Sequence, residues 1–286
     1  MTEFTTLIER LCRISELEAA RDPAPCPWPD RIDESEWCMS PELLSVYGTS
    51  AYDGLTDMQR RRLSLWEAVN FFSLNIHGER MLVAGIAHRL HRAGHEATSA
   101  YLHHFLDEEN RHMALFAEFC QRYGGKIYRE KKFSVERPYS PGEEDFLFFA
   151  KVFVFEEIVD RYNRTMAEDS RLVPVAQYIN QTHHRDEARH LAFGRNLVVQ
   201  LFREYSPKWQ EAELIRVRAD LSAYITAVWK EYYNPDAYRD AGLTDPFGTY
   251  HNCLQDAQCR AHRRTISQGA VRHLLEHGIL LEEPTV

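Results

Sequence analysis

Apolar positions along this chain recur with the spacing of helices. No stretch alternates apolar and polar residues between turn signals, as a strand would, whereas apolar residues three and four positions apart run through long segments. The four strongest of these segments span about residues 56–92, 95–122, 142–168 and 173–205. The pattern therefore predicts an all-α protein.

The connections between these four segments predict how their helices are arranged. The first and second segments, and the third and fourth, are separated by only a few residues, so each pair is expected to pack antiparallel. The second and third segments are joined by a long stretch, GGKIYREKKFSVERPYSPG, at 124–142. Two antiparallel pairs joined by one long crossover are the ferritin-like form of the four-helix bundle.

Shorter helical segments flank the predicted bundle on both sides. They are expected at 3–21, just after Ser40-Pro41, at about 207–233 and at about 250–277. The proline-rich stretch 21–31 cannot be helical throughout, because each proline lacks the amide hydrogen and restricts the residue before it. The stretch 234–248 is rich in turn residues and is expected to separate the last two helices.

The same pattern predicts the domain organisation. One core of helical segments, at about 56–205, accounts for the strongest apolar periodicity. A chain of this length can be built as one large helical domain. We therefore interpret residues 1–286 as a single ferritin-like domain, with additional helices in 1–55 and 206–286.

Composition and charge narrow the class of protein. The chain has 286 residues, 44% of them hydrophobic, and its net charge of −9 argues against a nucleic-acid-binding protein. The longest apolar run, at 146–155, is far too short to cross a membrane, and the N-terminal residues show no signal-peptide pattern. The six cysteines form no CxxC pair and are expected to be reduced thiols. We therefore expect a cytoplasmic protein without nucleic-acid or membrane partners.

A five-residue pattern occurs twice, as EENRH at 108–112 and as DEARH at 186–190. On a helix, residues three positions apart lie about 60° from one another, so each copy places a Glu and a His on one otherwise apolar face. Buried carboxylates are paired or bind metal, because an unpaired one is costly. Two Glu-x-x-His pairs that face one core are the ligands of carboxylate-bridged di-metal bundles. The repeat therefore predicts four metal ligands, namely Glu109, His112, Glu187 and His190.

The other two bundle helices should each add one glutamate to a di-metal site. Glu79 is the single carboxylate in the middle of the apolar face of the first segment, about 120° away from Glu67. The third segment offers Glu156 and Glu157, which lie about 100° apart. Glu156 is nearer the apolar side, whereas Glu157 belongs to a face with i,i+4 charge pairs typical of exposure to solvent. We choose Glu156 and keep Glu157 as the alternative.

The remaining residues of the repeat are expected to support the ligands. A metal-bound imidazole usually donates its other N–H to a carboxylate. Glu108 and Asp186 each adjoin a predicted ligand glutamate and are expected to accept this bond by reaching across to the opposite helix. Arg111 and Arg189 are expected to balance the negative charge of the site.

His183 extends the pattern of the fourth segment to His-x-x-x-Glu-x-x-His. It lies on the same face as the Glu-x-x-His pair, within about 60° of arc. A seventh ligand exceeds the four carboxylates and two histidines of the usual bundle site. His184 is its competitor, about 60° off on the other side. The alternative interpretation is a histidine that only packs or hydrogen-bonds near the site.

Four stretches together resemble one known family: HHRDEARH at 183–190, EENRH at 108–112, NIHGER around Glu79 and VFEEIVDRYNR at 154–164. They are similar to the p-aminobenzoate N-oxygenase (AurF-type) di-iron family, over roughly residues 60–205. The extra histidine is the most specific mark, because ferritins, rubrerythrins and most bundle oxygenases lack it. The resemblance implies seven iron ligands, namely Glu79, Glu109, His112, Glu156, His183, Glu187 and His190.

The resemblance also implies a function. Such an oxygenase uses two iron ions and O2 to convert the amine of a small molecule to a hydroxylamine or nitro group, as in secondary metabolism. An external electron donor, a reductase or a ferredoxin, is expected because the chain shows no flavin, nicotinamide or iron–sulfur motif. Manganese suits the same ligands, and no catalytic residue beyond the metal centre is predicted. The oligomeric state stays open, with a homodimer the commonest arrangement.

Three other functions compete with this interpretation. A di-iron monooxygenase or desaturase that acts on a C–H bond would use the same ligands. An iron-handling ferritin-like protein is disfavoured by His183 and by the extra helices. A bundle with ion pairs and no metal is disfavoured because four buried carboxylates would be hard to stabilise without cations.

Overall fold

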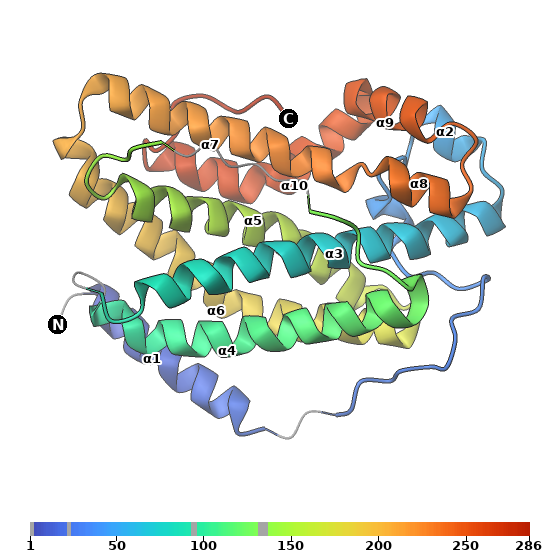
Figure 1. Cartoon of the computed structure of the whole chain (residues 1–286), viewed down its shortest axis with the longest axis horizontal. Helices are drawn as coiled ribbons and strands as arrows, with labels where there is room; N and C mark the ends of the chain where they lie inside the picture. The colour runs from blue at the N-terminus through green and yellow to red at the C-terminus, as the bar shows by residue number, and fades with distance from the viewer. Residues whose placement is uncertain (1–2, 22–23, 93–95, 131–136) are drawn as a thin grey trace.

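Four long helices form the centre of the computed structural model, which describes residues 3–21, 24–92, 96–130 and 137–286 (Figure 1). Within these ranges the chain contains no β-strand, apart from one isolated bridge between Trp37 and Leu172. The four central helices are α3 (Asp57–Arg89), α4 (Glu96–Phe119), α5 (Glu143–Glu168) and α6 (Pro174–Tyr205). The predicted all-α fold class is confirmed, and the predicted bounds of these helices are correct to within about three residues.

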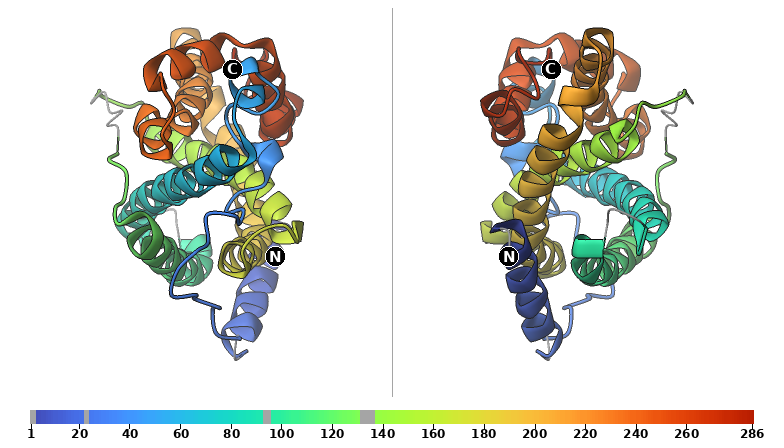
Figure 2. Two further views of the ribbon diagram at one scale, coloured as in Figure 1. Left: turned by 90° about the vertical axis from the view of Figure 1, so that its right-hand side faces the viewer. Right: turned by 90° about the vertical axis from the view of Figure 1, so that its left-hand side faces the viewer.

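The central helices form two antiparallel pairs. α3 packs along α4 and α5 packs along α6, and only a few residues separate the two helices of each pair along the chain. A long connection leads from α4 to α5; it begins with the π-helical turn η2 (Cys120–Gly124), and its described parts are residues 125–130 and 137–142 (Figures 1 and 2). This is the ferritin-like four-helix bundle with one long crossover that the sequence predicts.

Local signals in the sequence fix where the long helices begin. Thr56 accepts a hydrogen bond from the Gln59 amide, and the Gln59 side chain accepts one from the Thr56 amide, so a capping box opens α3. Pro174 occupies the first turn of α6, where its missing amide hydrogen costs nothing. These caps set the register of the two helices and hence the faces they turn toward the core.

Shorter helices cover the bundle on two sides (Figure 2). α1 (Glu3–Ala19) packs against α4 and α6, whereas α7 (Glu211–Tyr232) and α10 (Ala257–Glu276) pack against α5. The predicted flanking helices are therefore present at both ends of the chain. The remaining short helices of the described fold are η1 (Pro41–Leu43), α2 (Ser50–Asp53), η3 (Ser206–Lys208), α8 (Pro235–Ala241), which packs on α3, and a helix that follows α8.

The interpretation of the C-terminal third as two helices separated by a turn region is wrong in detail. The stretch 234–248 contains α8 and the first residues of a second helix, α9 (Pro246–Gln255). Asn234 caps α8 by accepting a hydrogen bond from the Asp236 amide, and Pro235 occupies its first turn. Asp256 separates α9 from α10 and caps α10 in the same way. The turn residues of this region therefore act as caps of short helices.

Two glycines allow α3 and α5 to approach closely. A Cβ atom at Gly78 would overlap the ring of Phe155, and one at Gly85 would overlap the ring of Phe148. Each pair of positions is seven residues apart on its helix, so both contacts lie on one face of each helix. The residues that directly follow Gly78 and Phe155 are the two predicted ligand glutamates of these helices. The close approach therefore sets how near those glutamates come to each other.

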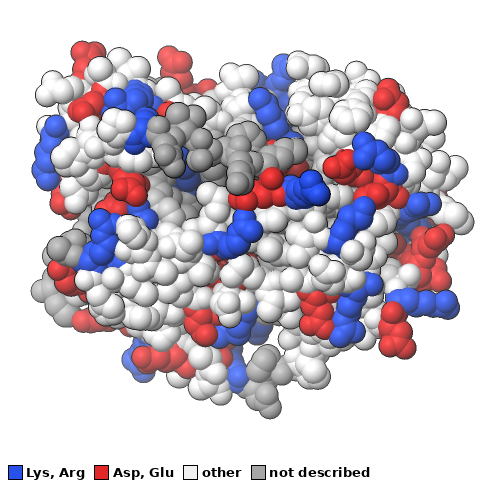
Figure 3. Space-filling model, in the orientation of Figure 1, with Lys and Arg blue, Asp and Glu red and all other residues white. Residues whose placement is uncertain are grey.

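The surface carries charges of both signs (Figure 3), and the cysteines are unpaired. In the described part of the chain, no helix combines the length and apolar character needed to span a membrane. Positive and negative side chains are interspersed on the face shown in Figure 3. All six cysteines are free thiols, as predicted.

A buried carboxylate, Glu67 of α3, anchors the loop before α2. It accepts hydrogen bonds from the Ser45 amide (2.8 Å) and the Ser45 hydroxyl (2.6 Å), and that hydroxyl also contacts the Tyr238 phenol. The described residues include no ion pair of Glu67. Burial raises the pKa of Glu67 to about 7, against the opposing effect of the two Ser45 hydrogen bonds.

Glu67 is expected to make the stability of the protein depend on pH. Its folded pKa lies above the usual value of 4.5, so the folded chain keeps a proton that the unfolded chain has lost. The free energy of unfolding should therefore fall by about 3 kcal/mol as pH rises from about 4.5 to about 7. Urea unfolding at several pH values, on the parent and on Glu67→Gln, measures this contribution as the difference between the two curves. Curves that run parallel across this range would contradict it.

Candidate metal centre

Seven predicted ligands meet in the middle of the bundle. Each side chain is at most 2% exposed, and all four central helices contribute. α3 and α5 each supply one glutamate, α4 supplies a Glu-x-x-His pair, and α6 supplies a glutamate and two histidines. The structure thus brings together Glu79, Glu109, His112, Glu156, His183, Glu187 and His190.

The ligand atoms form three overlapping groups, within each of which all of them lie within 4.8 Å of one another. Glu109 and Glu187 each belong to two groups, as carboxylates that bridge two ions would. His183 also belongs to two groups. The full groups are Glu79, Glu109, His112 and His183; Glu109, Glu187 and His190; and Glu156, His183 and Glu187.

Many polar atoms of this cluster lack a hydrogen-bond partner. Both carboxylate oxygens of Glu79 and of Glu156 are buried without one, as are one oxygen each of Glu109 and Glu187 and the Nε2 atom of His183. Buried polar atoms are normally satisfied, because leaving them unpaired is costly. Four carboxylates also carry the charge that two divalent cations would neutralise. The residues present therefore fit a pair of metal ions.

The pKa values of the cluster without cations also fit a site for metal ions. Burial, reinforced by the neighbouring carboxylates Glu109 and Glu187, raises the pKa of Glu79 and of Glu156 well above the usual range. Burial acts to lower the pKa of His112, but its hydrogen bonds to Asp186 and Glu109 raise that pKa to about 9. Protons thus occupy positions that cations would take, and metal binding would displace them.

Two carboxylates orient the histidines from the opposite helix, as predicted. Asp186 of α6 accepts from Nε2 of His112 (3.0 Å), and Glu108 of α4 accepts from Nε2 of His190 (2.7 Å). Because Nε2 of both rings donates to these carboxylates, Nδ1 is the atom left to bind a metal ion once its own proton is displaced, and in both rings Nδ1 faces the cluster glutamates. The two histidines are therefore oriented so that Nδ1 can bind a metal ion.

One arginine joins these two carboxylates. Arg189 donates to Glu108 (2.7 Å) and to Asp186 (2.7 Å), and its Nε donates to the Ser15 hydroxyl of α1 (3.0 Å). The prediction that Arg111 also balances the site is wrong. Arg111 points away from the bundle, with 49% of its side chain exposed, and pairs with Asp107 on its own helix. Ser15 is a supporting residue that no sequence signal identified.

The two competing candidates on α5 and α6 lie outside the cluster. Glu157 bonds to Arg195 (2.6 Å), and its other oxygen lies against Gly269 of α10. His184 bonds to Asp160 (2.5 Å). The expectation that Glu157 lies on a solvent-exposed face is wrong, because α10 covers that face and leaves this residue buried. The geometry therefore favours Glu156 and His183 over their neighbours.

The adjacent glutamates of α5 offer a matched test of the ligand assignment. Glu156→Gln is expected to lower the bound iron below two ions per chain, because an amide replaces a carboxylate in the cluster. Glu157→Gln should keep two ions, because this side chain contacts Arg195 and not the cluster. Metal analysis of the two purified variants beside the parent checks both expectations. Equal iron in both variants would contradict the choice of Glu156.

Asn163 is a further residue at the cluster that sequence reasoning missed. Its amide nitrogen lies 2.7 Å from Nδ1 of His183, and its side chain is fully buried. It follows Glu156 by seven residues, two helical turns along the same face. A polar residue at that spacing on a buried face was the available signal.

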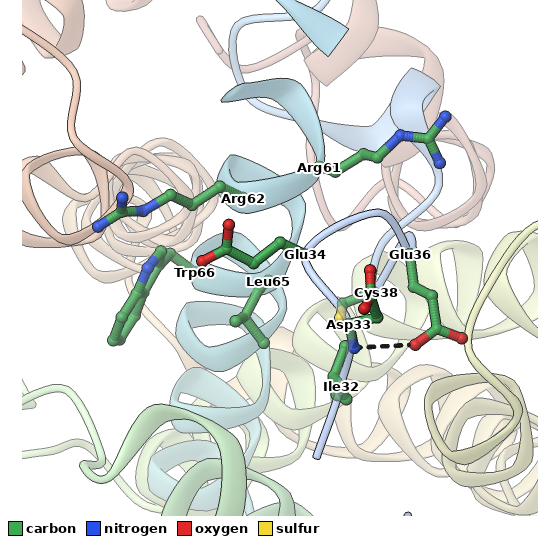
Figure 4. A pocket seen from close by; sticks show the side chains of 9 residues that line it. All are labelled: Ile32, Asp33, Glu34, Glu36, Cys38, Arg61, Arg62, Leu65 and Trp66. Carbon is green, nitrogen blue, oxygen red and sulfur yellow. Dashed lines mark hydrogen bonds between the residues drawn. The ribbon is translucent and has the colours of Figure 1, made fainter. Parts of the chain in front are cut away.

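A separate cavity of about 220 Å³ opens between the loop at 32–38 and the start of α3 (Figure 4). Trp66 and Arg62 line one side, and Glu36 lies toward the other. Trp66 precedes Glu79 by 13 residues, or about 20 Å along the helix. This cavity is therefore not part of the metal centre.

The bundle and its buried Glu/His cluster define the class: a ferritin-like protein with a di-metal carboxylate centre. The chain belongs to the p-aminobenzoate N-oxygenase AurF family, whose family model matches residues 2–278. It is therefore a non-haem di-iron oxygenase that acts on a small molecule.

Comparisons with individual proteins add little to this result. Among solved structures, the chain is similar to a point mutant of an R2-like ligand-binding oxidase with an anaerobically reconstituted Mn/Fe cofactor. The two share 16% sequence identity, the alignment covers 93% of each chain, and the TM-score is 0.45. The comparison with curated proteins gives no significant match.

Proposed function

We propose that this protein oxidises the amine nitrogen of a small molecule to a hydroxylamine or nitro group, with two iron ions held by the seven clustered residues. The observation that carries the proposal is His183. Its Nε2 atom lies 2.9 Å from Glu187 and 3.4 Å from Glu79, inside the ligand cluster. The family name supports the choice of nitrogen as the atom that is oxidised.

The ligand atoms of the proposed site follow from the contacts of the rings. His112 and His190 would bind through Nδ1, because their Nε2 atoms bond to Asp186 and Glu108. His183 would bind through Nε2, which faces the glutamates. Three neutral imidazoles add donors without adding charge, so the four carboxylates alone balance two divalent cations.

The protein supplies binding, orientation and a dry environment. Held by the seven clustered residues, two ferrous ions would supply electrons and open coordination positions for dioxygen. Burial of every ligand excludes water, and the bonds of Glu108, Asp186 and Arg189 hold the histidines in place. The first oxidation consumes the amine, one O2, two electrons and two protons, and yields the hydroxylamine and one water. The two electrons must come from an external donor, which we propose to be a reductase or a ferredoxin.

Product analysis tests the proposal. The iron-loaded protein is reduced, exposed to ¹⁸O2 and incubated with ¹⁵N-labelled primary amines, aromatic and aliphatic. A hydroxylamine product would gain one labelled oxygen, and a nitro product would gain two and lose two hydrogens. Either mass change, together with the ¹⁵N chemical shift of that group, supports N-oxidation. Labelled oxygen on carbon with an unchanged ¹⁵N shift would replace the proposal by C–H oxidation. The Glu156→Gln variant, which is expected to hold less iron, is the control for oxidation by iron that is free in solution.

A further inference from the structure

His183 differs from the other two clustered histidines in the partner of its second ring nitrogen. His112 and His190 each bond to a carboxylate from the opposite helix. Nδ1 of His183 instead meets the side-chain amide of Asn163, at 2.7 Å. Asn163 is fully buried, and its Oδ1 atom has no hydrogen-bond partner. A carboxamide thus takes the place that a carboxylate takes twice elsewhere in the site.

The hydrogen on the ring decides whether His183 can bind metal. As the amide lies, Nδ2 of Asn163 donates to Nδ1 of His183, and the ring hydrogen is then on Nε2, toward Glu187. That tautomer cannot offer the Nε2 lone pair. The other tautomer carries its hydrogen on Nδ1 and needs an acceptor there. Turning the Asn163 amide by 180° supplies the acceptor, because its oxygen and nitrogen exchange places at nearly the same shape.

An amide can serve both tautomers, whereas the alternatives cannot. A carboxylate at this position would only accept, and an apolar side chain would do neither. A carboxylate would also add a third outer negative charge beside Glu108 and Asp186, for which Arg189 is the joint partner. A neutral side chain that both donates and accepts therefore suits a ligand that must hold its hydrogen on either nitrogen.

We propose that Asn163 is the positioning residue of His183: its amide donates to Nδ1 while the site is empty and accepts from Nδ1 when Nε2 binds metal. This inference rests on the ligand role of His183 in the proposed function. Asn163 acts through His183 and does not itself touch the ions. It holds the ring toward the ions and selects the tautomer that binds them.

Metal affinity measures the proposed role without relying on turnover. Iron(II) binding is titrated anaerobically against a competing chelator for the parent, Asn163→Leu, Asn163→Asp, His183→Ala and the Asn163→Leu/His183→Ala double variant. Asn163→Leu is expected to weaken binding about 10- to 100-fold, the usual cost of losing the partner of a metal-bound histidine. Asn163→Asp should restore binding, because a carboxylate accepts the same N–H. The double variant should bind no more weakly than His183→Ala alone.

Two further measurements separate positioning from packing. Asn180→Leu is the matched control, because Asn180 is equally buried and its amide donates to the Ala176 carbonyl of its own helix. It should bind iron like the parent. In the zinc-loaded protein, which is diamagnetic, the ¹⁵N spectrum of His183 should show hydrogen on Nδ1, hydrogen-bonded in the parent and without that hydrogen bond in Asn163→Leu.

Each outcome decides between the inference and the assignment on which it rests. Parent-like affinity in Asn163→Leu, together with weak binding in His183→Ala, would overturn the role of Asn163 and leave the ligand assignment intact. Parent-like affinity in His183→Ala would overturn the ligand assignment itself. If the double variant loses as much iron affinity as the two single variants lose together, Asn163 acts by packing. If Asn163→Leu fails to fold, Asn163→Asp and the ¹⁵N spectrum still decide, because hydrogen on Nε2 in the loaded parent contradicts the proposal.

Discussion

Replacing Arg189 by methionine is expected to lower the free energy of unfolding by about 3–5 kcal/mol, the usual cost of leaving a buried charge without its partner. The guanidinium is 6% exposed and bonds to two carboxylates, Glu108 and Asp186, that are 4% and 12% exposed. Methionine fills a similar volume without charge. Both carboxylates would then remain in the core, paired only with histidines.

The pKa values of the two carboxylates show what Arg189 contributes. Burial acts to raise the pKa of Asp186, but the His112 hydrogen bond and the Arg189 charge hold it well below its usual range. The same combination, with His190 in place of His112, lowers the pKa of Glu108 against burial. Without the arginine, both acids should become easier to protonate and should hold their histidines less firmly.

Arg111→Met is the matched control for this experiment. It changes the same residue type at the same position of the other repeat copy, but among the residues that the structure describes its exposed side chain pairs with Asp107 alone. Exposed pairs of this kind contribute about 0.5 kcal/mol or less. Urea unfolding of both metal-free variants and the parent compares the three directly. Equal losses of stability in the two variants would show that the buried network of Arg189 contributes no more to the free energy of unfolding than an exposed ion pair does.

The sequence was sufficient to find most of the candidate site. The repeat EENRH and DEARH predicts the direction of its side chains, because three-residue spacing on a helix places Glu and His on one face. Local spacing also separated Glu156 from Glu157, since a step of about 100° moves a side chain from the core to another face. Where the ligand pattern follows from one helix at a time, periodicity is enough.

Features that depend on contacts between distant segments could not be found in this way. Arg111 and Arg189 occupy the same place in the repeat, yet only Arg189 lies beneath α1, where Ser15 meets it. The pattern of its own helix predicts that Glu157 is exposed. It is buried because α10, more than 100 residues later, covers it. The spacing of Asn163 from Glu156 places it on the buried face of α5, but its partner, a histidine of the next helix, does not follow from α5 alone.

Iron binding is expected to stabilise the folded protein by an amount that grows with the concentration of free metal. The buried, unpartnered atoms of the cluster exist together only in the folded chain, so metal binds the folded state in preference to the unfolded one. For each bound ion, linkage then predicts about 2.7 kcal/mol at a free iron concentration 100 times its dissociation constant, and about 4.1 kcal/mol at 1,000 times.

Two variants show whether that stabilisation arises at the proposed ligands. Anaerobic urea unfolding is measured over a series of buffered iron(II) concentrations. The parent and Glu157→Gln should gain about 1.4 kcal/mol for each tenfold rise in free iron above the dissociation constant of one ion, because Glu157 lies outside the cluster. Glu156→Gln should begin to gain stability only at higher iron concentrations, because its weakened site fills later. A parent whose unfolding midpoint does not move with iron would contradict the metal centre itself, since four buried carboxylates in a ligand cluster cannot bind cations tightly in the folded state and leave its stability unchanged.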